Sequence, residues 1–318
     1  MKTLIDKVLS HSSVQAQPPV FVDVGASGGL ADEWRLFAPH SICIAFDADT
    51  RDFSVDAVEG GDWKKLYTLN RLLSDKASDE LPFYLTRSPH CSSSLAPDNP
   101  ALQPYAFAKL FDVERTVELS SVTLPEVLAE LKITEIDWYK TDSQGTDLRI
   151  FRALPDAILD RVIVAAFEPG IINAYRGEDK LHALMAFMSD RPFWVSEMIV
   201  KGSQRIGADL LEALPERKRK HLTYFNKMAP GWAEITYFND LAEGLPVRSY
   251  LLAWAFATVR GQDGYAHHAA QLGAKASGDP LFAELAAYSK DAVARPLSYG
   301  KLIAGGFRKL TRRIPGLR

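Results

Sequence analysis

Cysteine is scarce in this chain of 318 residues, which contains only Cys43 and Cys91. Two cysteines are too few for the disulfide framework of a small secreted domain, and they do not form a Cys-x-x-Cys pair. We therefore expect a reducing, cytoplasmic environment. The sequence also lacks an apolar run near the roughly 20 residues of a membrane-spanning helix, and its N-terminus carries an early acid, so neither membrane insertion nor export is expected.

Charge of either sign is not in large excess. The formal net charge of −3 gives no general attraction to nucleic acid, so no nucleic-acid partner is expected. The length suffices for one large α/β domain with an accessory element, or for two modest domains. Composition therefore indicates a globular protein with a sizeable core, and only the sequence motifs indicate a function.

The most informative motif is Val-Phe-Val-Asp-Val-Gly-Ala-Ser-Gly-Gly at residues 20–29. Its apolar, β-branched start predicts a buried strand, and its glycines allow a tight turn close to a ligand. The dinucleotide fingerprint G-x-G-x-x-G is missing. Cationic amino and sulfonium groups suit a nearby carboxylate, so the motif favours S-adenosylmethionine over a pyrophosphate. The predicted cofactor-binding residues here are Asp23, Gly25, Ala26, Ser27 and Gly29.

Strand-like and helix-like segments alternate along the chain, which predicts an α/β fold with a mostly parallel sheet of about seven strands covered on both faces. The predicted strands cover residues 20–24, 42–46, 66–73, 136–142, 162–168, 193–200 and 233–238. The predicted helices cover residues 3–12, 29–38, 123–131, 146–154, 178–190 and 208–217. Residues 87–104 are rich in proline and serine and are predicted to form a long loop.

The strand pattern stops after residue 239, and residues 245–292 show helical periodicity only. We therefore predict a sheet domain over residues 1–239 and a helical extension over 240–318. Residues 301–318 contain six Lys or Arg residues and no acid. This basic tail would suit peripheral contact with an anionic membrane surface, and the alternative is a solvated terminus.

Acids follow four of the predicted strands, namely Asp23, Asp47, Asp142 and Glu168. Ligands of open α/β sheets bind at the carboxyl ends of the strands, so these acids are candidates for one site. An acid that merely caps its own turn is the alternative for each. Asp47 is placed to accept hydrogen bonds from both ribose hydroxyls, and Ser74 and Asp75 are predicted near the adenine.

Lys140 is unusual because it lies inside a strand that should be buried on both faces. A buried lysine needs a counter-charge or loses its proton. Asp142, on the same strand, and Glu168, on the expected neighbouring strand, are its predicted partners. A structural ion pair and a role in holding substrate or cofactor both remain open.

Several motifs occur in order and together resemble the FkbM family of methyltransferases over about residues 20–200. They are the 23–29 motif, Phe46-Asp47, the serine loop at 92–95, and the segment Asp-Trp-Tyr-Lys-Thr-Asp-Ser-Gln-Gly-Thr-Asp at 137–147. The departures are mild: Ser27 replaces the family's usual Asn, Gly28 replaces an apolar residue, and Asp47 and Asp147 each replace a Glu. The resemblance implies a class I methyltransferase (Rossmann-like) fold that uses S-adenosylmethionine to methylate a hydroxyl of a sugar, glycan or natural product.

Methyl transfer to a hydroxyl requires alignment of the acceptor and removal of a proton. The predicted catalytic bases are Asp142, Glu168 and His90, in that order of preference. Lys140 is predicted to hold the substrate or cofactor. The alternative for His90 is that it is an ordinary surface histidine. Carboxylates of Asp142, Asp147 and Glu168 could instead hold a divalent ion, but no histidine or cysteine spacing supports one, so no metal is predicted.

Two rival functions remain. A nicotinamide-dependent oxidoreductase would share the strand, the glycine turn and the ribose acid, but should show the missing fingerprint. A non-catalytic methyltransferase-like binding module is disfavoured by the Lys140, Asp142 and Gly145 set.

Overall fold

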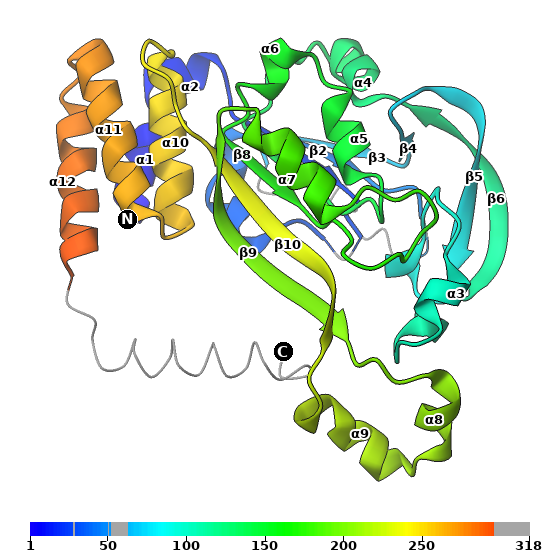
Figure 1. Ribbon diagram of the computed structural model, residues 1–318. Helices are drawn as coiled ribbons and strands as arrows, with labels where there is room; N and C mark the ends of the chain where they lie inside the picture. The colour runs from blue at the N-terminus through cyan, green and yellow to red at the C-terminus, as the bar shows by residue number, and fades with distance from the viewer. Residues whose placement is uncertain (28, 50, 52–62, 296–318) are drawn as a thin grey trace.

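The computed structural model describes residues 1–27, 29–49, 51 and 63–295. It confirms the predicted fold class, an α/β fold with a mostly parallel seven-stranded sheet and C-terminal helices (Figure 1). The strand order is β3-β2-β1-β7-β8-β10-β9, in which β10 is antiparallel to both neighbours and the other adjacent pairs are parallel. The strands are β1 Val20–Val24, β2 Ile42–Phe46, β3 Lys65–Leu69, β7 Trp138–Thr141, β8 Val164–Phe167, β9 Phe193–Ser203 and β10 Ala229–Asn239.

Four helices cover one face of this sheet: α4 Leu124–Leu131, α5 Asp147–Arg152, α6 Asp156–Leu159 and α7 Leu181–Ser189. Their apolar side chains share a core with the strands, which includes Tyr139, Phe151 and Phe167. The capping box predicted at the start of α4 is present, because Thr123 and Glu126 each accept a hydrogen bond from the other's backbone N–H. This face therefore forms much as the sequence pattern predicts.

The opposite face is covered differently from the prediction. The expected helix over 29–38 is wrong, since the structure has two 3-10 turns there, Asp32–Leu36 and Ala38–His40. Helices α1 Lys2–Leu9, α2 Ser12–Ala16 and α10 Val247–Val259 cover the face instead. Phe256 of α10 packs against Phe21, Phe37 and Trp138, with ring centroids 5.0 to 5.7 Å away. The C-terminal helices therefore share one core with the sheet.

Arg248 joins α10 to the amino-terminal edge of the sheet. Its guanidinium donates to both carboxylate oxygens of Asp137 at 2.7 Å and to the backbone carbonyls of Gln17 and Pro18. Asp137 also accepts a 2.8 Å hydrogen bond from the Val20 N–H. Arg248 and Asp137 are both buried, so this ion pair lies inside the packed core.

Two further helices, α11 Asp263–Ser277 and α12 Leu281–Ala294, stack outside α10 (Figure 1). The basic tail predicted from the sequence lies in residues 296–318, outside the described residues. Across the described part of the chain, the helices are too short or too polar to cross a bilayer.

A second, three-stranded sheet was not predicted. It consists of β4 Leu72–Leu73, β6 Val113–Val122 and β5 Ser78–Thr86, in the order β4-β6-β5. The strand predicted over 66–73 is therefore wrong as one element, since its first part belongs to β3 and its last two residues pair with β6. The predicted loop 87–104 is largely irregular but contains a 3-10 turn, Pro89–Cys91, and the short helix α3 Asn99–Leu102; another 3-10 turn spans Ala108–Phe111.

Strands β9 and β10 form a long ribbon that extends beyond the rest of the sheet. Only residues 235–238 of β10 pair with β8, whereas the whole of β10 pairs with β9. The ribbon carries two helices, α8 Ala208–Ala213 and α9 Glu216–Phe225, at the bottom of Figure 1. The single helix predicted over 208–217 is thus two helices.

Candidate functional site

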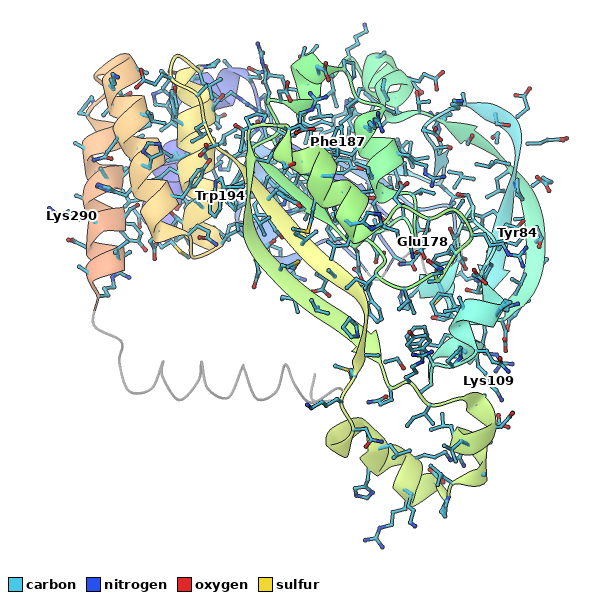
Figure 2. The ribbon with its side chains drawn as sticks, in the orientation of Figure 1. Tyr84, Lys109, Glu178, Phe187, Trp194 and Lys290 are labelled. Carbon is cyan, nitrogen blue, oxygen red and sulfur yellow. The ribbon has the colours of Figure 1, made fainter. Side chains whose placement is uncertain are left out.

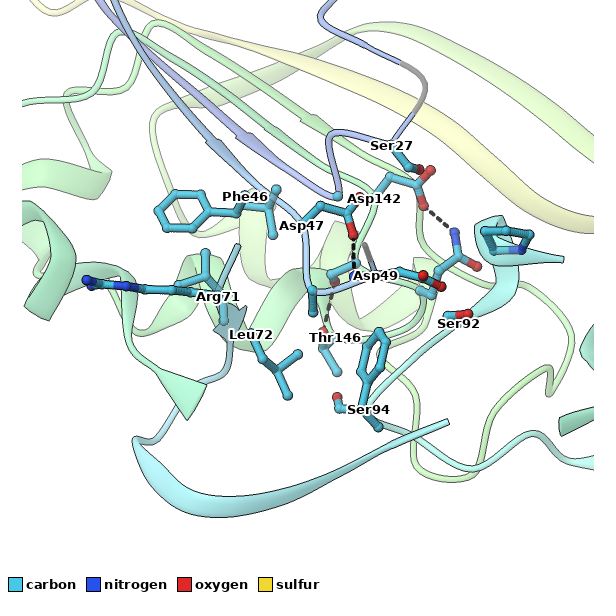
Figure 3. A pocket seen from close by; sticks show the side chains of 18 of the residues that line it. Ser27, Phe46, Asp47, Asp49, Arg71, Leu72, Ser92, Ser94, Asp142 and Thr146 are labelled. Carbon is cyan, nitrogen blue, oxygen red and sulfur yellow. Dashed lines mark hydrogen bonds between the residues drawn. The ribbon is translucent and has the colours of Figure 1, made fainter. Parts of the chain in front are cut away.

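A cavity lies where the strand order reverses, between β1 and β7, at the carboxyl ends of the parallel strands. It contains about 580 Å³ of space, part of it open to solvent. Its lining comes from the ends of β1, β2 and β7, from residues 71–73, and from the segment 89–94 (Figure 3).

The glycine turn after β1 brings the ends of β1 and β7 together. Gly25 has φ +78°, and a Cβ there would lie 2.1 Å from the carbonyl oxygen of Asp142. The N–H groups of Gly25 and Ala26 both donate to the Phe46 carbonyl at 2.9 Å. Gly25 and Ser27 line the cavity, whereas Ala26 is buried and Gly29 lies outside the lining. Only glycine fits the position of residue 25.

Asp47 follows β2, as predicted, and lines the cavity. Its carboxylate accepts a 2.8 Å hydrogen bond from the Asp49 N–H and is 8% exposed (Figure 3). Burial raises the pKa of Asp47 to about 6. Asp49, which also lines the cavity, forms an ion pair with Arg51 at 2.6 Å. Arg51 therefore balances the charge of Asp49, and Asp47 is the acid that makes this side of the cavity negative.

Lys140 forms its ion pair with Asp23, at 2.7 Å, and not with the predicted partners Asp142 or Glu168. The parallel register places Asp23 directly opposite Lys140 on the adjacent strand, so the two side chains share one face. Burial lowers the pKa of Lys140, but the surrounding carboxylates, Asp23 first, raise it above its ordinary value. Asp23 is fully buried, and this pair lies outside the cavity lining.

Asp142 follows β7 and lines the cavity. One carboxylate oxygen accepts a hydrogen bond from Nε2 of Gln144 (Figure 3). The Oε1 of Gln144 in turn accepts a hydrogen bond from the Tyr175 hydroxyl at 2.9 Å. Burial, and then the charge of Asp147, raises the pKa of Asp142 to about 7. This carboxyl group therefore changes its protonation state near neutral pH.

Glu168 and Asp147, the other two acids that follow strands at this end of the sheet, do not line the cavity. Burial, and then the charge of Asp142, raises the pKa of Glu168 to about 9. Asp147 accepts hydrogen bonds from the Thr141 hydroxyl and the Ser143 N–H, and so holds the turn between β7 and α5. Within the described ranges, no three His, Cys, Asp or Glu side chains are grouped as a metal site would require.

His90 lies in the 3-10 turn 89–91 and lines the cavity, with Nδ1 3.4 Å from the Ser27 hydroxyl. Ser74 and Asp75 do not lie at the end of the third strand as predicted, because β3 ends at Leu69 and the chain then joins the second sheet. The cavity wall at that point is formed by residues 71–73.

Sequence reasoning missed several residues at the site. Arg71, Leu72 and Leu73 were assigned to a strand interior, although the Asn70-Arg71 pair that interrupts the apolar run was a signal for a break. Phe83 reaches the cavity from the second sheet, and Tyr175 contacts Gln144 from the segment after β8. No sequence signal indicated these last two.

The sequence matches no protein-family model and no curated protein. One solved structure similar to the chain is the precorrin-6y C5,15-methyltransferase from Geobacter metallireducens GS-15, at 12% identity and a TM-score of 0.32. The similarity covers 75% of this chain and 88% of that chain. At this level the similarity supports no functional argument.

Proposed function

We propose that this protein is an S-adenosylmethionine-dependent O-methyltransferase that acts on a hydroxyl of a small molecule or glycan, as the FkbM resemblance implies. The observation that carries the proposal is an acidic cavity at the point where the strand order reverses, with Asp47, Asp49 and Asp142 in its lining. The seven-stranded order with one antiparallel strand beside the edge is also that of class I methyltransferase sheets.

The cavity residues fit a cationic nucleoside cofactor. Asp47 is recessed at the end of β2, where it can accept hydrogen bonds from two ribose hydroxyls. The acidic lining favours the positive amino and sulfonium groups. The turn after β1 leads into a 3-10 turn, Asp32–Leu36, and not into an α-helix. A pyrophosphate would therefore lack the α-helix N-terminus that usually binds it, which disfavours the nicotinamide alternative.

The chain's own contribution to transfer would be orientation and proton removal. The bound cofactor supplies an electrophilic methyl group. Asp142, held by Gln144, is the proposed general base, because it lines the cavity and its pKa of about 7 lets it accept a proton near neutral pH. We propose that His90 contacts the acceptor at the cavity, and that the Asp23–Lys140 pair orients the end of β7.

Isothermal calorimetry tests the cofactor assignment. We expect S-adenosylhomocysteine to bind and NAD not to bind; NAD binding without S-adenosylhomocysteine binding would refute the proposal. Incubation with methyl-labelled S-adenosylmethionine and a panel of sugar nucleotides and glycans then tests the acceptor class, with label in a hydroxyl of one of them as the expected product.

The variant Asp47→Ala is expected to bind S-adenosylhomocysteine about 100-fold more weakly, because two hydrogen bonds to a charged group are lost at roughly 1.5 kcal/mol each. The melting temperature should stay near that of the wild type, since the carboxylate lies at the cavity wall. Asp75→Ala is the matched control, an exposed acid outside the lining, and its affinity should not change. Unchanged affinity in Asp47→Ala would remove this residue from the site.

A further inference from the structure

The helices α8 and α9 lie at the same edge of the sheet as the cavity. Strand β9 runs in the same direction as β1, because both β8 and β9 are antiparallel to β10, so the chain leaves β9 at the carboxyl edge. We call residues 204–228, which contain these two helices, the α8–α9 projection. It is joined to the rest of the protein by a 3.0 Å hydrogen bond from the Ala106 N–H to the Gln204 carbonyl and by the Lys109–Glu212 ion pair. Figure 2 shows Lys109 beside this projection.

The projection has apolar side chains that the protein does not cover. None of the six residues of α8 is buried, although its sequence is Ala-Asp-Leu-Leu-Glu-Ala. The side chain of Leu210 is 61% exposed, and Met228, where the chain returns to β10, is 36% exposed. Helices in globular proteins normally bury their apolar residues, so the described chain leaves Leu210 of α8 largely without cover.

Basic residues gather on the same projection. Residues 201–228 contain seven Lys or Arg residues and three Asp or Glu residues, in a chain whose net charge is −3. Arg217, Lys218 and Arg219 on α9, and Lys227 after it, are exposed. None of these four forms an ion pair with another described residue. The projection is therefore a local positive surface on an acidic protein.

We propose that the α8–α9 projection docks on an anionic lipid bilayer, with Leu210 in the headgroup region and the α9 cations against the lipid phosphates. The exposed leucine of α8 and the exposed lysine and arginine residues of α9 are the two side-chain types by which interfacial helices bind membranes. A nucleic acid would satisfy the cations but would leave Leu210 in water, so the bilayer is the better fit. This docking does not depend on the proposed function. If both hold, the acceptor would be presented from the membrane to the carboxyl edge.

Sedimentation of the full chain with vesicles tests the proposal. We expect binding to vesicles that contain phosphatidylserine and none to pure phosphatidylcholine. The triple variant Arg217→Glu, Lys218→Glu, Arg219→Glu should bind at least about 100-fold more weakly, since each cation near the surface contributes about 1 kcal/mol. Leu210→Asp tests the apolar contact independently and should also weaken binding.

The control is a triple charge reversal elsewhere, Lys2→Glu, Lys76→Glu, Lys290→Glu, all at exposed positions. Figure 2 shows Lys290 on α12, far across the molecule from α9, and this control should bind as the wild type does. Residues 301–318 are present in every variant, so they cannot explain a difference between them.

The proposal fails if wild-type protein does not bind phosphatidylserine vesicles, if it binds neutral vesicles equally well, or if the α9 triple variant still binds. It also fails if the α9 triple variant loses binding to a labelled oligonucleotide but keeps its binding to phosphatidylserine vesicles. Circular dichroism melts check that each variant is folded. Calorimetry with S-adenosylhomocysteine on the same samples reports the proposed function separately.

Discussion

Replacing Arg248 with methionine is expected to lower the free energy of unfolding by about 3–5 kcal/mol. The substitution leaves the Asp137 carboxylate buried without its counter-charge and removes the donors to the Gln17 and Pro18 carbonyls. Urea denaturation followed by circular dichroism measures the loss. Arg35→Met is the matched control: its ion pair with Asp32 is largely exposed, so the change should be under about 1 kcal/mol.

The double variant Arg248→Met, Asp137→Asn separates loss of charge pairing from loss of packing. Asparagine keeps an acceptor for the Val20 N–H but carries no charge, so the double variant should be more stable than Arg248→Met alone. A loss below about 1 kcal/mol in the single variant would contradict the view that this pair fixes α10 to the sheet.

Asp142→Asn is expected to lower methyl transfer by about 10² to 10⁴-fold, the usual contribution of a general base. Binding of S-adenosylhomocysteine should persist, because the substitution keeps the shape of the side chain. Transfer of labelled methyl to an acceptor found in the panel gives the rate, and calorimetry gives the affinity. Turnover at the wild-type rate would rule out Asp142 as the base.

The same variant should be more stable than the wild type at alkaline pH. The pKa of Asp142 is raised from 3.8 to about 7 in the folded protein, so folding is favoured most below pH 4 and this contribution is lost as the pH rises through 7. Asparagine has no such loss. The stability difference should therefore grow from near zero at pH 4 to about 4 kcal/mol at pH 8. Urea denaturation across this range measures it, and a pH-independent difference would contradict the assignment.

The strands with strong apolar character were predictable from sequence. The run before Gly25 and the run before Asp47 give β1 and β2 with their bounds unchanged, and the Thr123–Glu126 capping box gives the start of α4. The second sheet was missed because β5 and β6 bury few residues and so have no long apolar run, and Pro82 argues against a strand in β5. Those strands form because they pair with each other.

At the site, too, the positions that depend on local sequence were predictable and those that depend on strand pairing were not. Gly25 and Asp47 lie at the cavity because each directly follows the end of a strand. The partner of Lys140 could not be read from sequence, since it depends on which strand lies next to β7 and in what register. Ser74 and Asp75 were misplaced for the same reason, as the third strand ends earlier and the chain changes sheets.

Helix α10 also has a consequence for how the chain folds during synthesis. The aromatic side chains of Phe21, Phe37 and Trp138 are made early, but Phe256, which packs on them, leaves the ribosome more than a hundred residues after the last of these. Until then the part of this face that α10 covers in the folded protein stays open to water, and a chaperone that shields aromatic surface would have its longest opportunity there. Maturation should therefore be largely post-translational and slow.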